Sequence, residues 1–239
     1  MNRFTRVVMP CLAFAALVAA CDNTDDTTGI TTTNTANVRF INAISDANGN
    51  LALTANGSMV GSSQSFLTSG STFTCTTVPA GNNTLAFGTA NTGGTGIASS
   101  LGTSTSQMLS GGNYTLLATG TAANPQLLVI DNKPTTTAAT GFANVRFVNA
   151  TGVPIDFFAN TAGSSTLGTA TTSGQGARSF SGYTQVPITN GAFTFTSAGS
   201  TTPLMTSTGN FSSGGNYTVI LAPGANGVGY QSYVLNGSC

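Results

Sequence analysis

The octet ANVRFINA at residues 36–43 returns as ANVRFVNA at residues 143–150, and seven of its eight residues are identical. A second segment, GGNYTLL at residues 111–117, returns as GGNYTVI at residues 214–220. Two marks that recur in the same order indicate a tandem duplication of one domain. We therefore expect two copies of one fold, each beginning at an octet.

The composition favours strands over helices. Val38 and Phe40 alternate with Arg39 and Ile41, which predicts a strand with one apolar face and one mixed face. Hydrophobic residues make up 40% of the chain and charged residues only 5%, and Thr, Ser, Gly and Asn are abundant. These residue types suit strands and turns. The sequence therefore predicts an all-β protein.

Turn signals divide each repeat into about seven short strands. The first repeat spans residues 36–132, with turns expected at Asn56-Gly57, after Pro79 and at Gly111-Gly112. Strands at such regular spacing are typical of a sandwich or barrel. The second repeat, residues 143–239, follows the same order, and the Thr- and Ala-rich residues 133–142 are expected to link the two.

The first residues have the pattern of a lipoprotein leader. Residues 1–20 combine Arg3 and Arg6 with an apolar run that is too short to span a bilayer. The run ends in LVAAC at residues 17–21, which resembles a bacterial lipobox and predicts lipidation of Cys21. The alternative is an ordinary secretory signal that is cleaved before Cys21. Residues 21–35, rich in Asp and Thr, are expected to form a flexible tether.

The repeated marks resemble a known family. A strand reading A-x-V-R-F, a V-P-x-G-type turn and a late G-G-x-Y-T strand are similar to the bacterial domain-of-unknown-function family 4397 (DUF4397). The resemblance covers both repeats. It implies two tandem immunoglobulin-like antiparallel β-sandwich domains in a secreted or surface protein, and it implies no activity because the family has none assigned.

Two positions depart from the family pattern. The family often has His after the first strand, where this chain has Asn42 and Asn149. It often has Asp at the opening of the second strand, which Asp156 retains in the second repeat, whereas Ala52 or Leu53 takes that place in the first.

The side-chain inventory argues against several kinds of function. The chain has no His and no Glu, so a Ser-His-Asp triad is excluded, and we expect no enzyme activity. Asp46, Asp131 and Asp156 are the only acids beyond the tether. We expect no metal site and no cofactor, because clustered ligands are lacking. A net charge of zero argues against nucleic-acid binding.

Three charged residues are candidates for a site. Arg39 and Arg146 occupy equivalent positions in the two octets, and Asp156 could pair with Arg146 from a neighbouring strand. The functional interpretation is a ligand anchor repeated in both domains. The structural interpretation is an Arg that covers the sheet with its aliphatic stem. The latter is favoured.

Cys75 and Cys239 form the remaining pair of cysteines, because Cys11 lies in the leader and Cys21 would carry lipid. In an oxidising compartment they could form a disulfide, which would contribute about 2–5 kcal/mol of stability. The alternative is two free thiols, with Cys75 buried where the second repeat has Tyr183.

The sequence thus predicts a non-enzymatic protein of the bacterial cell envelope, exported to the periplasmic or surface face of a membrane and held there by an N-terminal lipid. Its two sandwiches would serve as a spacer, scaffold or adhesion module. The alternative is a module that binds an envelope glycan or another ligand. An envelope protein or a glycan is the expected partner.

Overall fold

The computed structural model describes residues 34–67, 73–160, 166–237 and 239. The expected signal peptide, the lipidation site Cys21 and all of the tether before residue 34 lie outside the described residues. Thr35, the last residue assigned to the tether, already belongs to the first strand.

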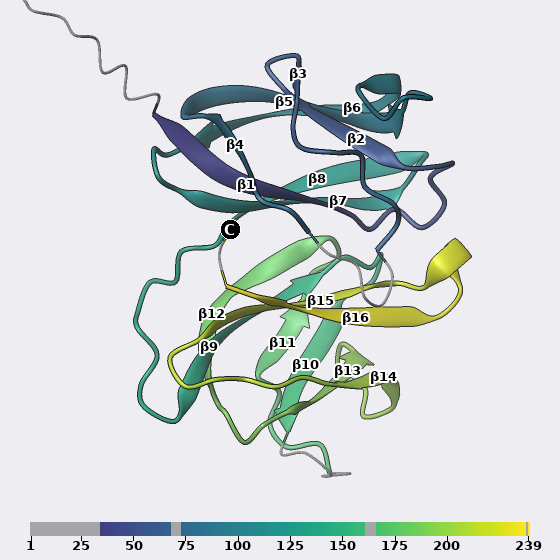
Figure 1. Ribbon diagram of the computed structural model, residues 1–239. Helices are drawn as coiled ribbons and strands as arrows, with labels where there is room; N and C mark the ends of the chain where they lie inside the picture. The colour runs from purple at the N-terminus through teal and green to yellow at the C-terminus, as the bar shows by residue number, and fades with distance from the viewer. Residues whose placement is uncertain (1–33, 68–72, 161–165, 238) are drawn as a thin grey trace, which may run out of the picture. The chain divides into compact units, whose positions relative to one another are not determined.

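Each repeat contributes eight strands (Figure 1). The first repeat forms β1 (Thr35–Asn42), β2 (Leu51–Ala55), β3 (Ser58–Met59), β4 (Thr76–Pro79), β5 (Gly81–Ala90), β6 (Ile97–Met108), β7 (Asn113–Thr121) and β8 (Asn124–Asp131). The second forms β9 (Phe142–Asn149), β10 (Ile155–Asn160), β11 (Thr172–Gln175), β12 (Ser179–Pro187), β13 (Ala192–Ser197), β14 (Pro203–Thr208), β15 (Asn216–Pro223) and β16 (Tyr230–Asn236). A short 3-10 helix, Ala225–Gly227, lies between β15 and β16.

The strands form four sheets of four strands. The first repeat has the orders β4-β1-β7-β8 and β3-β2-β5-β6, and the second has the equivalent orders β12-β9-β15-β16 and β11-β10-β13-β14. The prediction of two β-sandwiches is confirmed. One parallel pair per repeat, β1 with β7 and β9 with β15, interrupts the otherwise antiparallel pairing.

The parallel pair explains why two sequence marks recur together. The octet forms β1 and the Gly-Gly-Asn-Tyr-Thr segment leads into β7, so that Asn37 lies opposite Asn113 and Arg39 opposite Thr115. The Asn37 side chain donates a hydrogen bond of 3.0 Å to Asn113 Oδ1. The second repeat makes the same bond at 2.9 Å, from Asn144 to Asn216. The two marks are therefore halves of one structural unit.

The Gly-Gly turn before β7 is closed by a tyrosine. Gly111 has a φ of +71°, which favours glycine. Gly112 lies against the ring of Tyr114, and the Tyr114 hydroxyl accepts a hydrogen bond of 2.9 Å from the backbone N–H of Leu109. In the second repeat, Tyr217 accepts the equivalent bond from Ser212.

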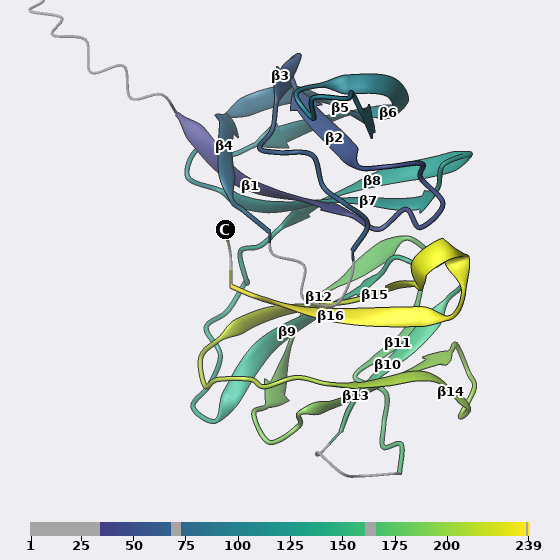
Figure 2. The ribbon, with the colours of Figure 1, turned by 45° about the vertical axis from the view of Figure 1, so that its right-hand side comes forward.

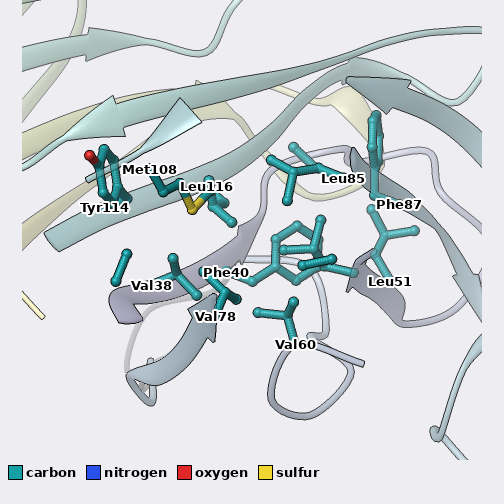
Figure 3. Close-up of a cluster of buried hydrophobic side chains, with 14 of the residues drawn as sticks. Val38, Phe40, Leu51, Val60, Val78, Leu85, Phe87, Met108, Tyr114 and Leu116 are labelled. Atoms are coloured by element: carbon teal, nitrogen blue, oxygen red, sulfur yellow. The ribbon is translucent and has the colours of Figure 1, made fainter. Parts of the chain in front are cut away.

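Each sandwich has an apolar core between its two sheets. In the first repeat, Figure 3 shows Val38, Phe40 and Leu116 of one sheet near Leu51 and other side chains of the facing sheet. In the second repeat, aromatic rings fill the equivalent space: those of Phe147 and Phe157 stack with centroids 5.0 Å apart, and the rings of Phe193, Phe195 and Phe211 pack around them. Burial of these side chains supplies the main stabilisation of each sandwich.

A third apolar cluster joins the two sandwiches. The outward faces of the sheets β4-β1-β7-β8 and β12-β9-β15-β16 meet, as Figures 1 and 2 show. We call this interface the seam. Its apolar residues are Ile41, Ala43, Leu67, Leu117, Leu128, Ile130, Val148, Ala150, Ile220, Ala222 and Leu235. Because of the seam, Thr33–Cys239 form one compact unit.

Backbone–side-chain bonds add to the seam. The Thr119 hydroxyl donates to the carbonyl of Ala150 at 2.8 Å, and the Gln231 amide donates to the carbonyl of Leu67, also at 2.8 Å. The guanidinium of Arg178 donates to the carbonyl of Asn124 at 3.0 Å. The seam therefore combines an apolar layer with directional bonds, which fix one relative orientation of the two faces.

Candidate functional site

Arg39 lies on the seam side of β1. Only 6% of its surface is exposed. Its Nε donates a hydrogen bond of 2.8 Å to Thr115 Oγ1, and its Nη2 donates one of 3.1 Å to the carbonyl of Gly237 in the other repeat. Arg39 thus joins both strands of the parallel pair to the second sandwich.

Arg146, its equivalent, is bound differently. It is 5% exposed, and its guanidinium lies 4.1 Å from the ring centroid of Tyr183 and 5.6 Å from that of Phe180. Cation–π contacts of this kind attract a guanidinium to an aromatic ring. Its Nε and Nη1 are buried and have no hydrogen-bond partner among the described residues. Arg146 is held by cation–π contacts with aromatic rings, whereas Arg39 is held by hydrogen bonds to oxygen atoms.

The environment of both arginines is poor in water. Burial lowers the pKa of the Arg39 guanidinium, and Tyr183 acts weakly in the opposite direction. Burial also lowers the pKa of Arg146, again opposed by Tyr183 and, to a smaller degree, by Asp131. Tyr183 is therefore electrostatically close to both guanidinium groups.

Hydrogen bonds cross this end of the seam in both directions. Arg39 of the first repeat donates to the carbonyl of Gly237, and the Tyr183 hydroxyl of the second repeat donates to the carbonyl of Asn132 at 3.1 Å. Asn132 and Gly237 are equivalent, because their N–H groups donate to Asn113 and Asn216 at matching positions. Equivalent carbonyls of the two repeats thus accept hydrogen bonds across the seam, but from donors that are not equivalent, since Arg146 corresponds to Arg39 and Cys75 to Tyr183.

Neither interpretation of the arginines anticipated this location. The two side chains lie between the sandwiches, not on an open sheet surface. Ile41 on the outward face of β1 and Ala43 just after the strand are also fully buried. The apolar Ile41 on the mixed face of this strand was the sequence feature that indicated a second layer over the sheet.

Asp156 lies in the other sheet of the second sandwich, on β10, so it is not on a strand next to Arg146 and the possible pairing of the two is not formed. Its Oδ1 accepts hydrogen bonds from Gly174 N at 2.6 Å and Ser173 Oγ at 3.2 Å, and its Oδ2 accepts one from Gly199 N at 2.8 Å. Burial raises the pKa of Asp156, but these hydrogen bonds outweigh it and hold the pKa below its usual value.

A disulfide joins Cys75 to Cys239, whose Cα atoms lie 5.4 Å apart. Cys75 precedes β4 by one residue and is exposed, so the alternative of a buried free thiol is wrong. The strand registers place Cys75 at the position of Tyr183, since Thr76 pairs with Val38 as Thr184 pairs with Val145. In the first repeat the bridge therefore takes the place of the tyrosine.

A pocket of about 400 Å³ opens where the β6–β7 turn and the start of the linker lie beside Asn216 of the second repeat. We call this place the polar end of the seam. The β6–β7 turn, the start of the linker and one residue of the second repeat line it: Leu109, Ser110, Gly111, Gly112, Asn113, Tyr114, Asp131, Asn132, Lys133, Pro134 and Asn216. The sequence did not point to this pocket. The feature of the sequence that could have indicated it is the repeated Gly-Gly-Asn-Tyr-Thr segment, which supplies Asn113 and Asn216.

The three acids of the described part each support a turn. Asp46 accepts a hydrogen bond of 2.9 Å from Ala122 N, and Asp131 accepts one of 2.9 Å from Lys133 N. Asp156 supports two loops, as described above. In the described residues no three His, Cys, Asp or Glu side chains gather at one point. No helix among these residues is long and apolar enough to cross a membrane.

A family model matches part of the chain. No curated protein matches the chain. The model of a domain of unknown function (DUF4397) matches residues 36–154. This range begins in β1 and runs through the first sandwich, the linker and β9 to the residue before β10. The comparison therefore shows one match to this domain family, over residues 36–154.

Proposed function

We propose that this chain is a non-enzymatic, lipid-anchored protein of a bacterial cell envelope, exported to the periplasmic or surface face of a membrane. Its two sandwiches would act together as a rigid spacer, scaffold or adhesion module. The observation that carries this proposal is the seam, which buries apolar side chains of both repeats and is closed by the Cys75–Cys239 disulfide. A disulfide suits the oxidising environment outside the cytoplasm.

We also propose that residues 143–239 are a second copy of the same domain. The strand orders of the two halves are equivalent. The Asn-to-Asn bond and the tyrosine-closed Gly-Gly turn occur in both halves at matching positions.

Lipid attachment can be tested in the full chain. Cells that express the wild type with labelled palmitate should incorporate label into the protein, and Cys21→Ala should abolish it. Cys11→Ala is the matched control, because it removes the other leader cysteine and should keep the label. Label that persists in Cys21→Ala would contradict the anchor.

Binding of an envelope glycan or another ligand is a second candidate function. The pocket at the polar end of the seam favours it, because both repeats contribute an asparagine to one cavity.

A further inference from the structure

We infer that the pocket at the polar end of the seam binds a small, neutral saccharide through its hydroxyl groups. This inference rests on the ligand-binding candidate and names its site and ligand class. It does not depend on the lipid anchor.

The pocket is assembled from both sandwiches. The β6–β7 turn and the linker start form most of its wall, and Asn216 comes from β15 of the second repeat. A volume of about 400 Å³ lies near the lower end of the range for small-molecule sites. The size therefore suits one or two sugar rings better than a long chain.

Two amide groups face this space from equivalent positions. The Oδ1 atoms of Asn113 and Asn216 accept hydrogen bonds from Asn37 and Asn144. These bonds fix the side chains, and no hydrogen bond to another described residue uses either Nδ2. The pocket thus has two pre-positioned donors for ligand oxygens.

One acid and one base complete the polar lining. Asp131 Oδ1 accepts from Lys133 N, which leaves Oδ2 as an acceptor, and the Lys133 ammonium is a donor. The lining residues therefore carry no net formal charge, so they offer an anion no net attraction. A hydroxyl group both donates and accepts, so a polyhydroxylated ligand can satisfy the carboxylate and the three donors together.

Apolar groups border the same cavity. Leu109 is 61% exposed, and Pro134 lies at the start of the linker. The Tyr114 ring is almost fully buried and serves the turn instead. Leu109 and Pro134 would therefore contact the C–H face of a sugar ring, and hydrogen bonds would supply most of the recognition.

Saturation-transfer NMR on the full chain in detergent micelles tests the inference. Glucose, N-acetylglucosamine and maltose are the probes, and glucuronate, a sugar acid with observable C–H protons, is the charged comparison. We expect saturable signals from at least one neutral sugar and none from glucuronate. Ser110→Trp should fill the pocket and remove the sugar signal. Ser213→Trp at the equivalent turn of the second repeat is the control and should keep it.

A second pair of variants changes only a few atoms, so that a loss of binding cannot be ascribed to misfolding caused by the bulky Trp. Asp131→Asn removes the carboxylate charge and should weaken sugar binding about tenfold. Asp46→Asn changes another acid that accepts a backbone hydrogen bond in a turn, lies outside the pocket, and should leave affinity unchanged. The inference is overturned if no neutral sugar binds, if glucuronate binds instead, or if binding persists unchanged in both pocket variants. Palmitate labelling reports the anchor separately, so the two failures are distinguishable.

Discussion

Single residues set the geometry of the repeated turn. A Cβ atom on Gly112 would lie 2.7 Å from Tyr114 Cε2 and 2.9 Å from the carbonyl oxygen of Leu109. Gly215 meets Tyr217 and Ser212 at similar distances. The second glycine of each Gly-Gly pair is therefore required by the ring that closes the turn.

Gly112→Ala should accordingly destabilise the fold by about 1–3 kcal/mol, because the ring or the backbone must shift. Gly182→Ala is the control: Gly182 has an ordinary φ and open space around its Cβ position. That change should be neutral or slightly stabilising. Urea unfolding measures both, and equal effects would contradict the steric explanation.

The two equivalent arginines should respond differently to replacement. Arg39→Met removes hydrogen bonds to Thr115 and Gly237 and should cost about 2–3 kcal/mol. Arg146→Met removes a buried guanidinium with two unpartnered nitrogens, and should change stability by less than about 1 kcal/mol or increase it. A larger loss for Arg146→Met than for Arg39→Met, measured by thermal unfolding, would refute this difference.

At the scale of elements, one carboxylate organises the end of the second sandwich. Asp156 opens β10 and accepts backbone hydrogen bonds from Gly174 in β11 and Gly199 after β13. It therefore connects three strands of one sheet through a single side chain.

Asp156→Asn should lower stability at neutral pH by about 1–3 kcal/mol. Because the pKa of Asp156 is lower in the folded state, its contribution is present above the unfolded pKa and is lost as the pH falls through the folded pKa. The difference between variant and wild type should thus shrink in acid. Asp46→Asn is the control, and a difference that is constant with pH would contradict the assignment.

The sequence predicted the elements well where local pattern decides. Alternation at Val38 and Phe40 identified β1, and Asn56 and Gly57 both have positive φ at the predicted turn into β3. It missed most of β6, where a Ser- and Thr-rich stretch carries no apolar period but pairs along β5. It also missed the seam, because the covering layer lies more than a hundred residues away along the chain.

At the scale of the molecule, the seam should make the two sandwiches unfold together. Calorimetry of the wild type should show one cooperative transition.

The disulfide should add to this stability. Cys75→Ser with Cys239→Ser should lower the free energy of unfolding by about 2–5 kcal/mol. The intact wild type should gain 2 Da on reduction of the one bridge. Two separate transitions in the wild type would show that the sandwiches are independent.

The disulfide also determines how the protein would carry a mechanical load. Cys239 is bonded beside β4, and β4 pairs with β1, the strand that follows the expected tether. A pull between the start of β1 and Cys239 would run through this bridge and the β1–β4 pair. The second sandwich would bear no tension. Under such a pull, the first domain alone would determine the mechanical resistance, and the two domains would not be loaded one after the other.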